Sequence, residues 1–420
     1  MTLHITNTRL DDRPVTVTCD DGVITAISDP ADAPAPQPGD DVLDGTGTAA
    51  IPGLVNAHTH AAMTLFRSWA GDLQLQEWLT EHIWPAEARL TADDVYWGTR
   101  LACIEMLRSG TTQFTDMYWF PEAVARAATD AGIRATVGAP LLDVNNDAGL
   151  AGLRDSALAS LDALTDAGPL IRPSLTPHAQ YTVSLESLEW IAATAAERDL
   201  VVHIHFCETV REIDEWMATH DERPTTVLDR LGIIGERTVL AHSCVMAPED
   251  YALVAERGAT IATNPVSNLK LASGRIFPYA TAAASGVRIG LGTDGVSSNN
   301  SLDLLADVKT LALVSKHEAG DPTVLPAEEA LAIATGQRSP LLGGAPIAVG
   351  ARADLALVEL DRPELTPGEL TANLVYAASG AVVDSTVVAG EVRMRHRHID
   401  GVDEVLAEVR NRAARIQAGT

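Results

Sequence analysis

Nine residues near the start of the chain carry most of the information about its fold: Pro52-Gly53-Leu54-Val55-Asn56-Ala57-His58-Thr59-His60. A short apolar run ends there in two histidines two positions apart, and in a β-strand this spacing points both imidazoles to the same side. If the strand belongs to a parallel barrel, both rings lie at its C-terminal mouth, where such barrels carry their active sites. The pattern His-x-His occurs three times, at His58/His60, His203/His205 and His396/His398. The surrounding sequence must therefore show which pair belongs to a metal site and which occurs by chance.

The middle of the chain repeats one unit, a brief apolar strand followed by a longer helical stretch. Two of the helices are expected over 92–109 and 185–198. The strands are expected near residues 54–58, 112–116, 133–138, 170–176, 201–206, 238–242, 258–263 and 288–293. Eight such units predict an α/β fold, a (β/α)8 TIM barrel. A doubly wound open sheet is the alternative, but no Gly-x-Gly-x-x-Gly follows the first strand.

Both ends of the chain differ from this middle part. Short β-like runs alternate with turn signals over residues 1–52, and similar β-like runs occur at 353–358 and 385–392. We therefore expect a small antiparallel β-domain, a β-sandwich built from both chain ends, from which the barrel is inserted. The expected divisions are 1–52 and 346–420 for the β-domain, with a terminal helix over 402–417, and 53–345 for the barrel.

The composition excludes several classes of protein. The 420 residues are 46% hydrophobic and carry a formal net charge of −27, so nucleic acid, which needs a basic surface, is not an expected partner. The first residues lack a basic and apolar signal sequence, and no uncharged apolar run approaches the ~18 residues that span a bilayer. The four cysteines form no Cys-x-x-Cys pair, which indicates buried thiols in a reducing compartment. We expect a cytoplasmic protein with no membrane partner.

Histidine or aspartate stands at the end of five of the expected strands. These residues are His58 and His60, His178, His203 and His205, His242, and Asp294. A lone histidine at a strand end is usually structural, but five such ends on the active face of a barrel indicate a metal site. Imidazoles with one carboxylate suit Zn²⁺, or less well Fe²⁺, with a position left for water. A two-metal site bridged by a modified lysine would need a lysine at the fourth strand end, where Thr176-Pro177-His178 stands, so one ion per subunit is expected.

These motifs resemble the amidohydrolase superfamily, in particular its methylthioadenosine/S-adenosylhomocysteine deaminase branch. The likeness extends over almost the whole chain, and several long motifs occur in the correct order. The most specific are His58-Thr59-His60, Ile83-Trp84-Pro85-Ala86-Glu87, Thr176-Pro177-His178-Ala179, His205-Phe206-Cys207-Glu208-Thr209, Asn264-Pro265-Val266-Ser267-Asn268-Leu269-Lys270 and Gly292-Thr293-Asp294-Gly295-Val296-Ser297-Ser298-Asn299-Asn300.

The resemblance implies a ligand set of His58, His60, His205 and Asp294. His203 competes with His205, but His205 is nearer the barrel mouth and is followed three residues later by Glu208, as the family pattern requires. His203 is therefore expected to be a buried polar residue behind the site. The third pair, His396 and His398, lies among arginines and is expected at the surface.

A bound metal ion lowers the pKa of its water ligand to roughly 7. The resemblance also implies roles for the groups beside the metal. Asp294 would accept the proton of the water and pass it to the leaving amine. His242 would hydrogen-bond the attacking oxygen, and Glu208 would protonate a ring nitrogen of the substrate. A solvated loop carboxylate is the plain alternative for Glu208.

Substrate contacts follow from the same resemblance. Glu87 would accept hydrogen bonds from the ribose hydroxyls, His178 would contact the sugar or ring, Trp78 the 5′ substituent and Ser298 the base. For Trp78, a simple core position is an almost equal alternative. Arg154 would match one of the two arginines that hold the amino-acid carboxylate of S-adenosylhomocysteine in this branch.

One departure from the branch affects the expected substrate. Ala139 stands where the branch has its other carboxylate-binding arginine, and this loss should weaken charged tails by roughly 2–3 kcal/mol. We therefore expect a deaminase of adenosine, 5′-deoxyadenosine and 5′-methylthioadenosine, with S-adenosylhomocysteine a poorer substrate. The alternatives are a triazine chlorohydrolase or guanine deaminase on the same scaffold and, more remotely, a non-catalytic scaffold protein. By analogy, the chain is expected to form a homo-oligomer.

Overall fold

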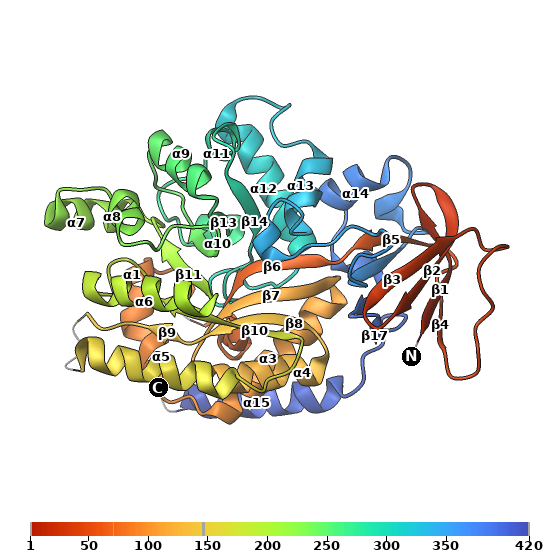
Figure 1. Cartoon of the computed structure of the whole chain (residues 1–420), viewed down its shortest axis with the longest axis horizontal. Helices are drawn as coiled ribbons and strands as arrows, with labels where there is room; N and C mark the ends of the chain where they lie inside the picture. Colours follow the sequence, from red (N-terminus) through yellow and green to blue (C-terminus); the bar gives the residue numbers. More distant parts are fainter. Residues whose placement is uncertain (1, 70, 145–147, 419–420) are drawn as a thin grey trace.

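A nearly closed parallel barrel forms the centre of the computed structural model, which describes residues 2–69, 71–144 and 148–418 (Figure 1). Neighbouring strands are hydrogen-bonded in the order β14-β13-β12-β11-β10-β8-β7-β6, and the short β9 (Pro140–Leu141) is added to β10. The barrel strands are β6 (Leu54–Thr59), β7 (Thr111–Met117), β8 (Arg134–Gly138), β10 (Ile171–Pro177), β11 (Val201–Phe206), β12 (Thr238–His242), β13 (Thr260–Thr263) and β14 (Arg288–Leu291). The barrel and its strand positions confirm the predicted fold class.

The two edge strands of the barrel approach each other just beyond β14. The backbone N–H of Asp294 donates to the carbonyl of His58 at 2.9 Å, which brings the first and last strand ends together. Parallel strands of this kind are buried on both faces, and every residue of β6, β7 and β12 is indeed buried. Below the strand ends, the interior is filled by small and branched apolar side chains: Val55, Ala57, Val201, Val239, Ala262 and Leu342.

Helices surround the barrel between the strands. Two of the long helices begin with capping boxes, α3 at Thr91 with Asp94 and α7 at Thr209 with Glu212. The main helices are α3 (Ala92–Arg108), α4 (Pro121–Ala131), α5 (Gly149–Leu164), α6 (Leu185–Arg198), α7 (Val210–His220), α8 (Pro224–Arg230), α9 (Pro248–Arg257), α10 (Pro265–Lys270), α11 (Tyr279–Ala284), α12 (Leu304–Ala319), α13 (Ala327–Ala334) and α14 (Leu370–Tyr376). Shorter helical turns are η1 (Ala61–Phe66), α1 (Leu75–Glu77), η2 (Trp78–Ile83), α2 (Trp84–Glu87), η3 (Pro340–Leu342), η4 (Pro363–Leu365) and η5 (Gly380–Val382).

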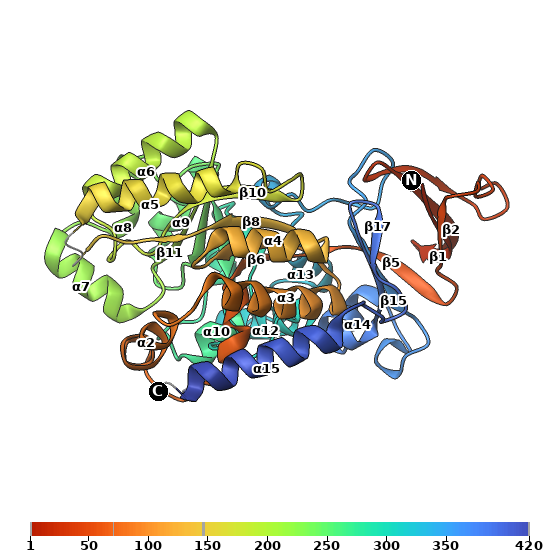
Figure 2. The ribbon, with the colours of Figure 1, turned by 90° about the horizontal axis from the view of Figure 1, so that it is seen from below.

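Both chain ends contribute to a second, separate sheet beside the barrel (Figure 2). Its strands are β1 (Leu3–Leu10), β2 (Arg13–Asp20), β3 (Val23–Ser28), β4 (Asp41–Asp44), β5 (Thr48–Pro52), β15 (Leu355–Glu359), β16 (Val383–Val388) and β17 (Glu391–Met394). The expectation of a purely antiparallel domain is wrong, because β1 pairs in parallel with both β4 and β5. β4 and β5 follow each other along one edge of β1, with only residues 45–47 between them, so both run in its direction.

The C-terminal helix α15 (Val402–Ala418) forms where the sequence predicts it and lies along α3 of the barrel (Figure 2). Val405, Val409 and Ile416 are buried against the barrel side, and Arg412 pairs with Asp93 at 2.6 Å. The division of the chain at residues 52 and 345 stays a prediction.

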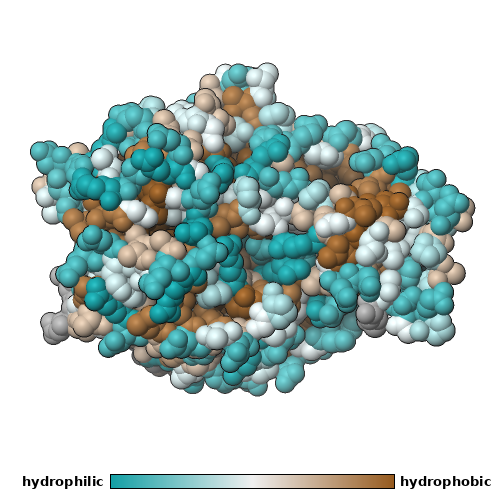
Figure 3. All heavy atoms as spheres, viewed as in Figure 1, coloured by the Kyte–Doolittle hydropathy of each residue, from teal (hydrophilic) through white to brown (hydrophobic). Residues whose placement is uncertain are grey.

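Hydrophilic side chains cover much of the face seen in Figure 3, in keeping with a net charge of −27. Across the described parts of the chain, no helix combines the length and the apolar character needed to cross a bilayer.

Candidate metal centre and substrate pocket

Four side chains from three separate regions of the barrel converge at its C-terminal end. His58 and His60 lie at the end of β6, His205 on β11, and Asp294 just after β14. The Nε2 atoms of His60 and His205 are 3.1 Å apart, and Asp294 Oδ1 lies 3.4 Å from His58 Nε2 and 3.3 Å from His60 Nε2. Because parallel strands end on the same side of a barrel, residues far apart in sequence meet at one point.

Hydrogen bonds at the opposite ring nitrogens orient these imidazoles. His60 Nδ1 lies 2.7 Å from the carbonyl of Met117, and His205 Nδ1 lies 2.8 Å from the carbonyl of His178. A carbonyl can only accept, so each Nδ1 carries the proton and each Nε2 presents a lone pair to the centre. His58 Nε2 is buried and has no hydrogen-bond partner among the described residues. An unpartnered lone pair facing a carboxylate and two further imidazoles fits a bound metal ion.

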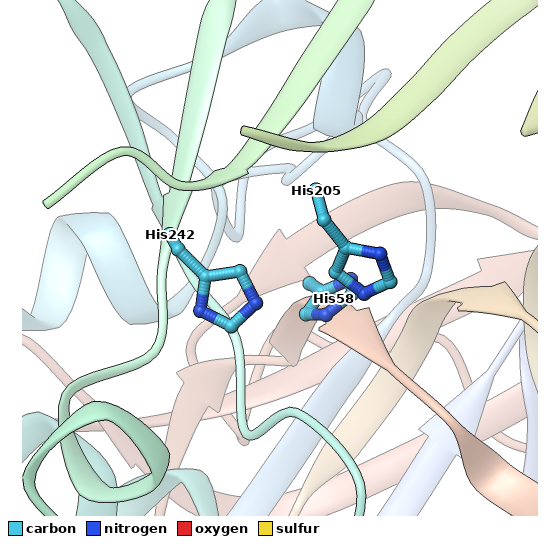
Figure 4. Close-up of side chains that lie close together, drawn as sticks. All are labelled: His58, His205 and His242. Atoms are coloured by element: carbon cyan, nitrogen blue, oxygen red, sulfur yellow. The ribbon is translucent and has the colours of Figure 1, made fainter. Parts of the chain in front are cut away.

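His242 also lies close to this point, as Figure 4 shows with His58 and His205. Its Nδ1 lies 3.0 Å from the Asn268 side-chain amide nitrogen, which donates to it. The amide is oriented by Cys244, whose thiol lies 3.3 Å from Asn268 Oδ1. An imidazole that accepts at Nδ1 carries its proton at Nε2, so in this arrangement the ring can donate a hydrogen bond toward the centre, although His58, His205 and His242 also lie close enough together to hold a metal ion.

The carboxylate of Asp294 is held in place from several sides. Its Oδ2 accepts hydrogen bonds from Ser267 Oγ at 2.6 Å and Ser298 Oγ at 3.0 Å, and its Oδ1 accepts the backbone N–H of Gly295 at 2.8 Å. Burial opposes ionisation, but the contacts with the histidines of β6 outweigh it and hold the pKa of Asp294 well below the usual value. Its backbone φ is +61°, in the left-handed region. Such strain persists where the surrounding structure fixes a functional side chain.

Glu208 follows β11 and is buried beside the same centre. Its Oε1 lies 3.5 Å from Asn268 Nδ2 and 3.7 Å from His242 Nδ1. Burial, and then the negative charge of Asp294, raises the pKa of Glu208 to about 8. At neutral pH this carboxyl therefore holds a proton, as a general acid must.

A cavity of about 800 Å³ opens from the metal centre and contains most of the predicted substrate residues. His60, His205, Glu208, His242 and Asp294 line its inner end. Nine of its lining residues come from one segment, 75–90, just before α3: Leu75, Gln76, Trp78, Leu79, Ile83, Trp84, Glu87, Ala88 and Leu90. The remaining lining residues that the structure describes are largely apolar, and neither arginine nor lysine is among them.

The segment that carries Trp78 and Glu87 is wound irregularly. Trp78–Ile83 is a π-helical stretch (η2). This form is rare in proteins as a whole, and where it occurs it often lies at a functional site. Glu87 is half-buried, and its Oε2 accepts a hydrogen bond from the Trp119 indole N–H at 3.2 Å. Burial raises the pKa of Glu87 above its usual value. Trp78 is buried but contributes to the cavity wall.

His178 and Ser298 also line the cavity. His178 Nδ1 lies 3.0 Å from Thr182 Oγ1, and burial lowers the pKa of His178 to about 4, so the ring is neutral. The hydroxyl of Ser298 already contacts Asp294 Oδ2 and the carbonyl of Gly295, both at 3.0 Å. Ser298 therefore supports the carboxylate as well as lining the pocket.

The scan against protein families matches residues 49–393 of the chain to the amidohydrolase family. The chain belongs to this family. This amidohydrolase is 46% identical over 384 residues to the 5′-deoxyadenosine deaminase of Methanoregula boonei, covering 89% of this chain and 86% of the relative. It is 44% identical over 356 residues to the 5-methylthioadenosine/S-adenosylhomocysteine deaminase 1 of Archaeoglobus fulgidus, covering 84% of each.

Solved structures agree with the fold of this amidohydrolase. An adenosine deaminase from Xanthomonas campestris, solved with bound zinc, superposes with a TM-score of 0.88 at 34% identity, covering 99% of this chain and 98% of that chain. The zinc-bound atrazine chlorohydrolase from Arthrobacter aurescens superposes with a TM-score of 0.86 at 23% identity over 98% of this chain and 99% of that one, a likeness of fold alone. The predicted resemblance is confirmed.

Arg154 is the predicted site residue that the fold does not bring to the cavity of the amidohydrolase. It is exposed on α5, and its guanidinium lies over the ring of Trp190, 5.4 Å from the ring centroid. The surface pair His396 and His398 is exposed and lies beside Asp384 and Asp400, far in sequence from the barrel mouth. Neither feature enters the site.

Three contacts of the site are not among those that the sequence predicts. Trp119 is hydrogen-bonded to Glu87, Ser267 to Asp294, and Asn268 to His242. Ser267 and Asn268 belong to a motif quoted for the resemblance, so their position after the seventh barrel strand could have identified them. Trp119 follows β7, and apart from this position at a strand end its sequence context does not mark it as a site residue.

Proposed function

We propose that this amidohydrolase is a zinc-dependent deaminase that hydrolyses adenosine-type nucleosides to inosine analogues and ammonia. The observation that supports it most is the convergence of His58, His60, His205 and Asp294 on one point, with the protonated carboxyl of Glu208 beside them. The names of the relatives support the same chemistry, since they include deaminases of 5′-deoxyadenosine, 5′-methylthioadenosine and S-adenosylhomocysteine.

The proposed cofactor is one Zn²⁺ per chain, held by those four residues, with Fe²⁺ as the alternative ion. Three imidazoles and a carboxylate form a ligand set that zinc accepts, and the buried, unpartnered Nε2 of His58 supports occupation of the centre. When bound, the ion acts as a Lewis acid and lowers the pKa of water.

Three side chains of the protein have separate roles in the proposed reaction. Glu208 delivers its proton to a ring nitrogen of the purine, which makes the neighbouring amino-bearing carbon more electrophilic. His242, with its proton at Nε2, donates a hydrogen bond to the attacking oxygen as negative charge develops there. Asp294 accepts the proton of the attacking water and transfers it to the leaving amine, and Ser267 keeps its carboxylate oriented.

The proposed substrate lies along the cavity with its ribose at Glu87. A carboxylate can accept from two vicinal hydroxyls, and the bond from Trp119 fixes the Glu87 carboxylate in advance. His178 contacts the sugar or ring as a neutral imidazole, Ser298 lies beside the base, and Trp78 packs against the 5′ substituent. Among the described residues that line the cavity there is neither arginine nor lysine to pair with a carboxylate, so small neutral 5′ groups are favoured over the charged tail of S-adenosylhomocysteine.

Ammonia release from a substrate panel tests this proposal. Zinc-loaded protein should deaminate adenosine, 5′-deoxyadenosine and 5′-methylthioadenosine faster than S-adenosylhomocysteine at matched concentrations. Asp294→Asn should abolish the activity on every substrate, whereas Asp361→Asn on the exposed surface is the matched control and should leave it unchanged. Turnover of guanine alone, or chloride release from a chlorotriazine, would keep the metal centre and overturn the proposed substrate.

Two further parts of the proposal concern the state of the protein. We expect a homo-oligomer, by analogy with enzymes of this family, and a reducing cytoplasm as its compartment. All four cysteines, Cys19, Cys103, Cys207 and Cys244, are buried and unpaired, which supports a reducing environment. Sedimentation equilibrium of the purified chain tests the first part, and thiol titration before and after reduction tests the second.

A further inference from the structure

His203 lies behind the metal centre and has no part in the chemistry proposed above. It stands two residues before His205 on β11 and therefore faces the same side of the strand. Its side chain is completely buried, and its Nε2 lies 2.8 Å from His58 Nδ1. The two rings meet edge to face, with an interplanar angle of 81° and centroids 4.9 Å apart.

The support for His58 differs in kind from that of the other two histidine ligands. His60 and His205 are held by backbone carbonyls, of Met117 and His178, which the barrel itself keeps in place. His58 is held by a side chain instead. The orientation of this one ligand therefore depends on the identity of a single residue.

The direction of the bond follows from the proposed role of His58. An imidazole that gives its Nε2 lone pair to a metal keeps its proton at Nδ1, so His58 donates and His203 Nε2 accepts. The proton of a neutral His203 then lies on its own Nδ1. This atom is buried and has no hydrogen-bond partner in the portion of the chain that the structure describes. An unpaired buried donor costs stability, so the arrangement is better explained by its effect on His58 than by a contribution to folding.

We propose that His203 is a positioning residue that fixes the tautomer and the ring orientation of His58 and thereby tightens metal binding. This inference rests on the ligand set given under the proposed function. It predicts that the metal affinity stays the same with any hydrogen-bond acceptor at the position of His203 Nε2. A side chain that cannot reach His58 should lower the metal affinity.

Three substitutions at this position separate positioning from a general effect on the barrel. In His203→Gln the side-chain oxygen can reach the position of Nε2 and accept from His58. In His203→Asn the amide is too short to reach, and in His203→Leu there is no acceptor. The matched control is His4→Leu, which removes a buried, hydrogen-bonded histidine from the small sheet, remote from the metal.

Zinc affinity is measured on the full chain by competition with a chromophoric chelator, and the visible spectrum of the cobalt-substituted protein reports the ligand geometry. Asn and Leu should weaken zinc binding about 10–100-fold and alter the cobalt spectrum, as losses of such outer contacts typically do. His203→Gln and His4→Leu should remain close to the wild type. If His203→Leu fails to fold, the Gln and Asn pair decides the question alone.

The outcomes distinguish this inference from the proposed function. Equal zinc affinity in the wild type and the Asn or Leu variants would overturn the role of His203 while keeping the metal site. Equal weakening by Gln and Asn would also overturn it, because packing rather than an acceptor would then matter. A wild-type chain that binds no zinc would instead contradict the ligand set itself.

Discussion

The proton on Glu208 is the feature of the site whose removal has the most sharply defined consequence. Burial and the charge of Asp294 raise its pKa from 4.5 to about 8. At pH 7 a carboxyl with the raised value is protonated in about 90% of molecules, against about 0.3% with the ordinary value. Without a bound ion, the environment of Glu208 therefore strongly favours the acid form at neutral pH.

Glu208→Gln keeps the size and one oxygen of the side chain but cannot deliver a proton. If Glu208 is the general acid, kcat should fall between about 10²- and 10⁴-fold, with a much smaller change in KM. The matched control is Glu215→Gln, the same change on the exposed face of α7, which should leave both constants unchanged. Steady-state ammonia release with 5′-deoxyadenosine measures both variants.

The pH dependence gives an independent test. Activity requires the protonated form, so it is present below the pKa of Glu208 and is lost as the pH rises through it. The positive charge of a bound ion favours the carboxylate, which places the alkaline limb at or below pH about 8. Glu208→Gln should lose this limb. Retention of more than a tenth of the wild-type kcat in that variant, or wild-type activity that still rises at pH 9, would refute the role of Glu208.

Four further outcomes follow from the structure. Glu87→Ala should raise KM for nucleosides far more than for free adenine. Trp119→Phe should raise KM for nucleosides by about 10-fold or more, because the hydrogen bond from its indole to the Glu87 carboxylate is lost. An equal rise in KM for nucleosides and for adenine would contradict the ribose contact. Arg154→Ala should change KM for no substrate, and a selective loss of S-adenosylhomocysteine would contradict its surface position. Removing the metal with a chelator should abolish activity and lower the melting temperature, with zinc restoring both.

The barrel could be predicted from the sequence because its strands are buried on both faces. The apolar runs at 54–58 and 201–206 match β6 and β11 closely, and α6 forms over the predicted residues 185–198. The small domain was predicted less well. Short alternating runs show that strands exist but do not show which strand pairs with which, so the parallel partners of β1 were missed.

The same limit explains what was predicted of the site. Residues at strand ends are brought together by the barrel whatever their distance in sequence, which is why His58 and Asp294 could be assigned to one centre. Arg154 lies on a helix, where the direction of a side chain depends on the buried face. Leu153, Ala157 and Leu161 form that face of α5, and Arg154 is turned away from it. Helical periodicity alone could have placed it at the surface.

The segment 75–90, which precedes α3, has a consequence for how new specificities can arise on this scaffold. It contributes nine of the residues that line the cavity, including Trp78 and Glu87, and none of the four proposed ligands lies within it. In the proposed function the reaction chemistry belongs to the scattered strand ends, whereas much of the cavity wall comes from this one contiguous segment. If Trp78 and Glu87 contact the substrate as proposed, exchange of this segment between relatives should change the substrate preference in one recombination step and leave the proposed ligands in place.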